Sequence, residues 1–215
     1  MREQANRRAA AALNGHAKQG IEEMVTSVVR SLGEALRPVR PGVAMLSSSK
    51  FSGFLGYALK VSSPAFADGQ PMPVRFTQDG DNLSPPLQWE GLPAQTQSAV
   101  LLVEDADIPL LRPLVHLIVH SIPPDKTEFA EGEIPLRVEG TAPGGWACGR
   151  NALGRPGWTA PTPPPGHGPH RYAFQVFALD ARPHFAYPPG RAMLLRTIRP
   201  HLIAQGRMIG TYERR

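Results

Sequence analysis

Two pairs of polar residues and one histidine could form a small binding pocket. Asp105 and Asp107 stand two positions apart in the stretch EDADIP, at the end of an apolar run. His170 and Tyr172 are also two positions apart. Because side chains alternate between the two faces of a strand, the members of each pair can point the same way. His116, between apolar neighbours in LVHLIVH, is the second histidine available to such a pocket.

This combination suits an anion that carries its own protons, such as a phosphate monoester or a carboxylate. Imidazole and phenol groups donate hydrogen bonds to the anion, and the carboxylates orient these donors. Two neighbouring carboxylates repel each other unless they meet donors or cations, or unless one keeps a proton. Simpler interpretations remain open: Asp107 and Pro109 can merely build a turn, and His116 can be a hydrogen-bonded core residue.

The histidines do not predict a metal centre. His116 and His120 have the spacing that chelates zinc on a helix, but on a strand this spacing separates them by about 13 Å. Zinc needs nitrogen ligands at about 2.0–2.1 Å. The sequence has one cysteine and contains no G-x-S-x-G elbow, phosphate loop or dinucleotide fingerprint. We therefore expect no metal and no cofactor.

The elements that must position these residues are mainly strands. Proline and glycine, 24 and 21 residues, separate short apolar runs whose period is two, which is typical of strands joined by shaped loops. The expected strands cover 57–63, 72–77, 86–91, 98–105, 114–122, 172–180 and 207–212. A helix is expected over 188–199, with Leu194, Leu195 and Ile198 on its inner face. Pro200 should kink or restart that helix, and Gly206 should end it.

Residues 1–50 form an extension to a domain at 51–215. Apolar residues recur every three or four positions within about 20–37, which predicts an amphipathic helix that ends at Pro38. We expect this helix to dock on its own domain or on a partner subunit, with a membrane surface or an organelle address as the alternatives. The extension carries eight Lys/Arg and four Glu, a net charge of +4, so the domain is nearly neutral. The sequence thus predicts neither nucleic-acid binding nor membrane contact, and no apolar run is long enough to span a membrane.

Seven stretches resemble, in order, the bacterial branch of the phosphatidylethanolamine-binding protein family, also called Raf kinase inhibitor proteins. They span about 57–215 and read SSPAFADGQPMPVRFT, DGDNLSPPLQW, VEDADIP, LVHLIVHSIP, GRNALGRPGW, PTPPPGHGPHRYAFQVFALD and HLIAQGRMIGTYER. The resemblance implies a mainly β fold of packed antiparallel sheets with peripheral helices. It also implies a small anion pocket that uses Asp105, Asp107, His116, Pro163, Pro164, His170 and Tyr172.

Three residues depart from the family pattern: Ala106, Leu117 and Ala160 stand where proline, tryptophan and glycine are usual. We expect these changes to affect the size and affinity of the ligand more than the existence of a pocket. Within the proline-rich stretch, strand alternation predicts that Arg171 points away from His170. His167 is expected to be a loop residue.

Three classes of function are consistent with the sequence. The leading hypothesis is a non-catalytic, cytoplasmic module that binds a phosphate-type group of a small molecule, lipid head group or phosphorylated protein partner, with kinase or protease regulation implied by other branches of the family. The alternative is an enzyme that performs acid/base chemistry as an isomerase, dehydratase or hydrolase. The third is an assembly protein that works through the helix at 20–37. We also expect a homodimer.

Overall fold

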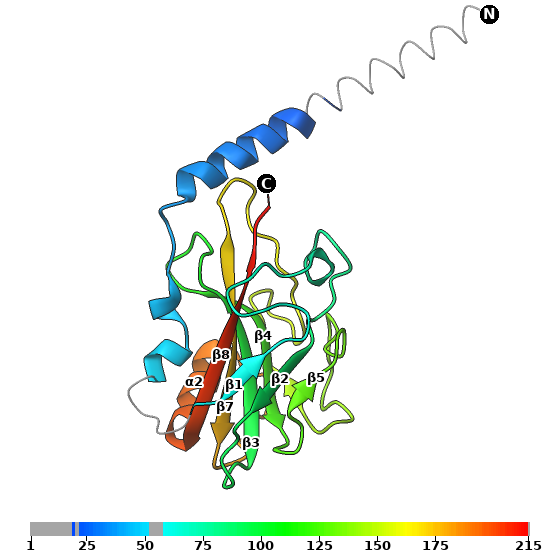
Figure 1. The fold of residues 1–215 in the computed structure, drawn as a ribbon, viewed down its shortest axis with the longest axis vertical. Helices are drawn as coiled ribbons and strands as arrows, with labels where there is room; N and C mark the ends of the chain where they lie inside the picture. The colour runs from blue at the N-terminus through cyan, green and yellow to red at the C-terminus, as the bar shows by residue number, and fades with distance from the viewer. Residues whose placement is uncertain (1–18, 20–21, 52–57, 215) are drawn as a thin grey trace, which may run out of the picture.

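The computed structural model describes residues 19, 22–51 and 58–214. Two antiparallel sheets pack face to face, and helices lie at the periphery (Figure 1). The five-stranded sheet has the order β6-β4-β3-β7-β8, and the three-stranded sheet has the order β1-β2-β5. The strands are β1 Lys60–Ser62, β2 Leu87–Glu90, β3 Ser98–Asp105, β4 Leu114–Ile122, β5 Glu128–Phe129, β6 Ala147–Cys148, β7 His170–Leu179 and β8 Leu202–Tyr212. The expected class, mainly β with peripheral helices, is confirmed.

The large sheet is buried on both faces, which explains why its strands are almost continuously apolar. Along β3, Leu101 and Val103 face the small sheet, and Val100 and Leu102 face helix α2 (Arg191–Ile198). Burial of β3 is complete from end to end. This central strand therefore holds its last residues, at the edge of the core, in a fixed position.

Most expected elements are present, and two expectations are wrong. Residues 72–77 do not form a strand but contain the 3-10 helix η3, Val74–Phe76, because Pro73 turns the chain and the carbonyls of Pro73 and Val74 accept bonds three residues on. Gly206 does not end a helix: it lies within β8 opposite Val176. The last helical segment is η4, Arg199–His201, which contains Pro200 and ends directly before β8. The two-residue strands β5 and β6 were too short to be recognised.

Helix 22–36 projects from the body of the domain (blue in Figure 1). The beginning of the expected amphipathic helix lies largely outside the described residues. Its apolar residues Met24, Val25, Val28 and Leu32 are exposed, so the structure shows no cover for most of the apolar stripe among the residues it describes. In the described part of the chain, no helix is long and apolar enough to cross a membrane.

The rest of the extension packs on the large sheet. The short 3-10 helices η1 (Val43–Met45) and η2 (Ser48–Phe51) follow the helix and bury Leu46 and Phe51. Ser47 donates to Glu104 through its backbone nitrogen (2.8 Å) and its hydroxyl (3.0 Å). The segment that precedes the domain in sequence is thus part of its packed structure.

Candidate anion site

The site lies where the central strands of the large sheet end. Asp105, the last residue of β3, is paired with Tyr172 of β7. On the other side of β3, the pairing with β4 shifts between Val103 and Glu104, so that His116 is an extra residue in β4. Such a bulge re-aims a side chain, and it places the His116 ring 5.2 Å from the Tyr172 ring, centroid to centroid.

Four of the predicted site residues meet in a buried cluster. His170 Nδ1 lies 2.7 Å from Asp105 Oδ2, and the His170 ring stacks on Tyr172. His116, which contacts Tyr172, bonds through Nδ1 to the Thr159 carbonyl at 2.6 Å. All four side chains are almost completely buried. Within the described chain, Tyr172 Oη and His116 Nε2 are buried without a hydrogen-bond partner.

The protonation states of these two atoms follow from their surroundings. Burial lowers the pKa of His116, so its ring is neutral at pH 7. Because Nδ1 must carry the proton that the Thr159 carbonyl accepts, Nε2 is an acceptor. Burial raises the pKa of Tyr172, and the charges of Asp105 and Asp107 raise it further. The phenol thus keeps its proton and can donate it.

Asp107 does not join the cluster of Asp105. Its side chain instead forms a bidentate ion pair with Arg171. Arg171 Nε lies 2.7 Å from Asp107 Oδ2, and Arg171 Nη2 lies 2.6 Å from Asp107 Oδ1. Burial alone would raise the pKa of Asp107, but the hydrogen bonds and charge of Arg171, together with the charge of Arg40, hold this pKa below its ordinary value. Arg171 therefore points away from His170, as strand alternation predicts, and is the partner of Asp107.

His167 is a buried member of the site that the sequence interpretation missed. Its Nδ1 lies 2.7 Å from His170 Nε2, and its Nε2 lies 2.9 Å from the Leu36 carbonyl. Three hydrogen bonds therefore run from the Leu36 carbonyl, through two imidazoles, to the Asp105 carboxylate. Both ends accept, so the three bonds need three protons, and two neutral imidazoles supply only two. We infer that this series of hydrogen bonds holds a third proton. Burial lowers the pKa of His167, so the third proton is shared between His170 and Asp105.

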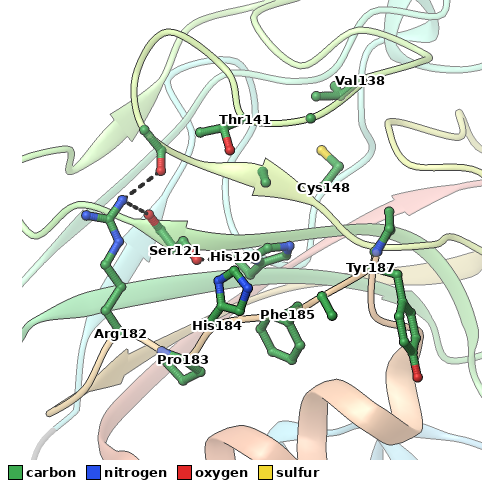
Figure 2. Close-up of a pocket in the computed structure, with 15 residues that line it drawn as sticks. His120, Ser121, Val138, Thr141, Cys148, Arg182, Pro183, His184, Phe185 and Tyr187 are labelled. Carbon is green, nitrogen blue, oxygen red and sulfur yellow. Dashed lines mark hydrogen bonds between the residues drawn. The ribbon is translucent and has the colours of Figure 1, made fainter.

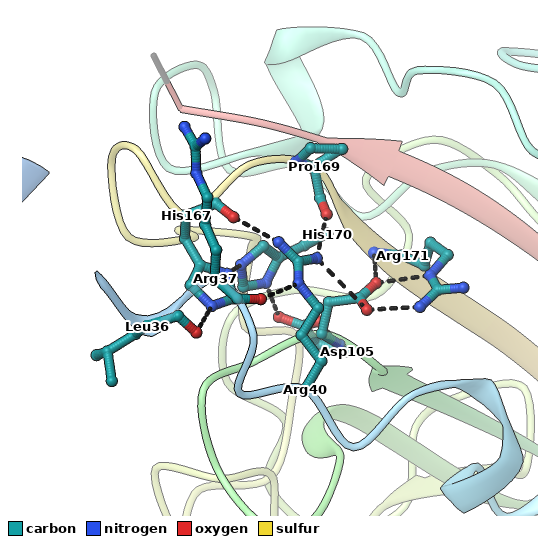
Figure 3. Close-up of polar contacts among 9 residues, drawn as sticks. Leu36, Arg37, Arg40, Asp105, His167, Pro169, His170 and Arg171 are labelled. Atoms are coloured by element: carbon teal, nitrogen blue, oxygen red, sulfur yellow. Dashed lines mark hydrogen bonds and ion pairs between the residues drawn. The ribbon is translucent and has the colours of Figure 1, made fainter. Parts of the chain in front are cut away.

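Residues of the extension close the outer side of the site (Figure 3). Arg37 Nε donates to the Gly166 carbonyl at 2.6 Å. Arg40 donates to the Pro169 carbonyl at 2.8 Å and to the His167 carbonyl, and its Nη1 lies 3.5 Å from Asp107 Oδ1. Neither arginine was among the predicted site residues. Their bonds to the loop carbonyls join positions 127–129 residues apart, which no local pattern reveals.

The proline-rich stretch forms the loop that carries His167. Pro163 is buried and Pro164 is partly buried, and the Pro164 carbonyl accepts the backbone N–H of His167 at 3.2 Å. Ala106, which replaces the usual proline, donates its N–H to the Arg171 carbonyl at 2.9 Å. A proline at this position could not make that bond. Alanine at position 106 therefore allows a hydrogen bond between the loop after β3 and the start of β7.

A cavity of about 400 Å³ lies beside the far end of β4 (Figure 2). It contains His120, Ser121, Cys148, Arg182 and Phe185. His120 packs edge-on against Phe185 and bonds through Nδ1 to the Ser121 hydroxyl at 3.1 Å. His116 thus belongs to the buried cluster near the start of β4, and His120 belongs to the cavity near its end. Among the described residues, no group of three or more His, Cys, Asp or Glu could hold a metal ion.

Replacing His120 by glutamine should make the free energy of unfolding less sensitive to acid. Burial lowers the pKa of His120 to about 4, whereas the unfolded chain takes up this proton near pH 6.5. The stability that the neutral ring contributes is therefore complete above pH 6.5 and is lost as pH falls toward 4. Urea unfolding at pH 7 and pH 4 should show a loss smaller by about 2–3 kcal/mol in the variant. Equal losses in both proteins would contradict the assignment.

Comparison with known proteins agrees with this architecture. The family model described as phosphatidylethanolamine-binding protein matches residues 62–213. A UPF0098 protein of Mycobacterium bovis is 39% identical over 176 residues, which cover 82% of this chain and 81% of the relative. A crystal structure of a putative homolog from Chlamydia trachomatis aligns with a TM-score of 0.66 at 32% identity, covering 74% of this chain and all of the other. The E. coli protein YbcL aligns with a TM-score of 0.67 at 28% identity, covering 73% and 99%.

Proposed function

The chain belongs to the phosphatidylethanolamine-binding protein family, and we propose that it is a non-catalytic module that binds a phosphate-type anion at the cluster around Tyr172. The observation that carries this proposal is the pair of unpartnered atoms, Tyr172 Oη and His116 Nε2, on rings in contact. Buried polar atoms nearly always have a hydrogen-bond partner. A ligand that reaches both atoms would satisfy them together.

The chemistry of the two atoms selects the class of ligand. The Tyr172 hydroxyl donates, so it suits an anionic oxygen. His116 Nε2 accepts, so it suits an oxygen that carries a proton. Monohydrogen or dihydrogen phosphate and phosphate monoesters offer both kinds of oxygen on one small group, whereas an ionised carboxylate offers only acceptors. This contrast favours phosphate over acetate.

Calorimetric titration with phosphate, phosphoethanolamine and acetate tests the proposal. We expect saturable binding of the two phosphate compounds and weaker binding of acetate. The variant Tyr172→Phe keeps the ring and removes the hydroxyl, and it should bind phosphate about tenfold or more weakly, since a hydrogen bond to a charged group contributes roughly 1.5–3 kcal/mol.

The matched control is Tyr212→Phe. The Tyr212 hydroxyl bonds to Asp79 at 2.7 Å outside the cluster, so its loss should leave phosphate affinity unchanged. A folded protein that binds none of the three compounds would refute the anion site. Turnover of a phosphate ester that disappears in Tyr172→Phe would replace the binding module with an enzyme.

A further inference from the structure

We propose that residues 33–42, which we call the cover segment, occlude the anion site and must move before a ligand can enter. This inference rests on the proposed function and concerns its regulation. The cover segment precedes the part of the chain that matches the family model, residues 62–213. It therefore lies outside the stretch that the family model describes.

The first support is that the site is buried in the structure and that the cover segment contacts its outermost histidine. His167, His170 and Tyr172 are 0% exposed, and Asp105 is 1% exposed. The chain from Asp105 through the two histidines ends on the carbonyl of Leu36, which belongs to the cover segment. The outermost imidazole of the site is thus capped by a backbone group of the extension.

The second support is that the cover segment forms hydrogen bonds with the loops on both sides of the site. On one side, Arg37 and Arg40 bond to carbonyls of the loop at 166–169. On the other side, the backbone N–H of Gly42 donates to the Ala106 carbonyl at 2.8 Å, between the two aspartates. The segment therefore bridges the loop before β7 and the loop after β3, which are the two walls of the site.

The third support is a close backbone approach that requires glycine. At Gly33, a side chain would place its Cβ 2.1 Å from the Pro165 carbonyl oxygen. Glycine in the interior of a helix costs about 0.5–1 kcal/mol relative to alanine, yet here it lets the helix lie directly against the loop that carries His167. At Gly166, with φ +77°, a Cβ would lie 2.7 Å from the Arg30 carbonyl oxygen. Both the helix and the loop therefore have a glycine where a side chain would collide with the other segment.

These two glycines provide a test that changes no charge. The variant Gly33→Ala should strengthen the helix and at the same time force it away from the loop. We expect it to bind phosphate about tenfold more tightly than the unaltered protein, because an open site no longer carries the cost of opening. Ser31→Ala, on the exposed side of the same helix, should leave the affinity unchanged.

Hydrogen exchange measured by mass spectrometry separates this inference from the proposed function. Gly33→Ala should speed exchange in the segments 36–42 and 166–172 without any ligand, and saturating phosphate should speed exchange in 36–42 of the unaltered protein. If phosphate instead protects 36–42 and Gly33→Ala weakens binding, the segment is part of the binding site and the occlusion model is wrong. Unchanged affinity and exchange in Gly33→Ala would also overturn it. If neither the unaltered protein nor Gly33→Ala binds phosphate but exchange rises in Gly33→Ala, the cover-segment inference stands and the proposal of an anion site is wrong.

Discussion

Replacing Arg191 by methionine should lower the free energy of unfolding by about 3–5 kcal/mol, because it leaves the carboxylate of Glu104 buried without its countercharge. Glu104 is 0% exposed in the middle of the large sheet. Its oxygens accept hydrogen bonds from Ser47, from the Gln175 amide at 2.9 Å and from Arg191. Arg191 is the only cation among the partners that the described chain provides, and methionine keeps most of its apolar stem. Urea unfolding at pH 7 measures the effect.

Two further variants show whether the buried charge causes the loss. The double variant Glu104→Gln with Arg191→Met removes the charge together with its partner, and it should recover at least half of the lost stability. Arg137→Met breaks an exposed ion pair with Glu139, 3.0 Å long, and should change stability by no more than about 1 kcal/mol. A double variant as unstable as Arg191→Met would mean that lost packing, and not charge, is responsible.

The residues around Glu104 also show how much of the fold could be predicted from the sequence. The strand 98–105 was predicted with the bounds that the structure has, because a short apolar run rich in β-branched residues and bounded by turn residues is typical of a strand. The role of Glu104 within that strand could not be predicted. Its partners Ser47 and Arg191 come from the extension and from α2, and nothing local to residue 104 indicates that they converge there.

The candidate site likewise contains residues that could be predicted from the sequence and residues that could not. Resemblance and strand alternation indicated Asp105, His116, His170 and Tyr172, which the structure brings together. Alternation also predicted that Arg171 points away, although a period of two cannot reveal that it pairs with Asp107 after the strand has ended. The bulge at His116 shifts the alternation by one residue, and the sequence carries no glycine or proline there to announce it.

The missed residues are those that act through loop geometry. His167 lies between Gly166 (φ +77°) and Gly168 (φ +90°), conformations that glycine adopts readily. These two turns direct its ring back toward β7, where it contacts His170. A pattern of strand or helix period contains no information on such a turn. The same holds for Arg37 and Arg40, whose acceptors are backbone carbonyls and so leave no trace in the side-chain sequence.

The proton count of the histidine chain leads to a second large effect, at Asp105. Replacing Asp105 by leucine should destabilise the protein by about 2–5 kcal/mol, because it leaves His170 Nδ1 buried without a hydrogen-bond partner. It also leaves the backbone N–H of Asp107 without the Asp105 oxygen that it meets at 2.7 Å. Replacing Asp105 by asparagine should cost only about 1 kcal/mol, although the same negative charge is lost.

The difference between the two variants arises from where the protons lie. The asparagine amide can accept from the Asp107 N–H through its oxygen and donate to His170 Nδ1 through its nitrogen. His170 Nε2 then donates to His167 Nδ1, and His167 Nε2 donates to the Leu36 carbonyl. All contacts of the chain are satisfied with two neutral imidazoles, so the third proton is no longer needed. Nitrogen-15 spectra of the imidazoles at pH 7 should therefore change from one ring with both nitrogens protonated, or sharing its proton with Asp105, to two neutral rings. If Asp105→Asn is as destabilising as Asp105→Leu, or if its spectra match those of the unaltered protein, the chain does not hold a third proton.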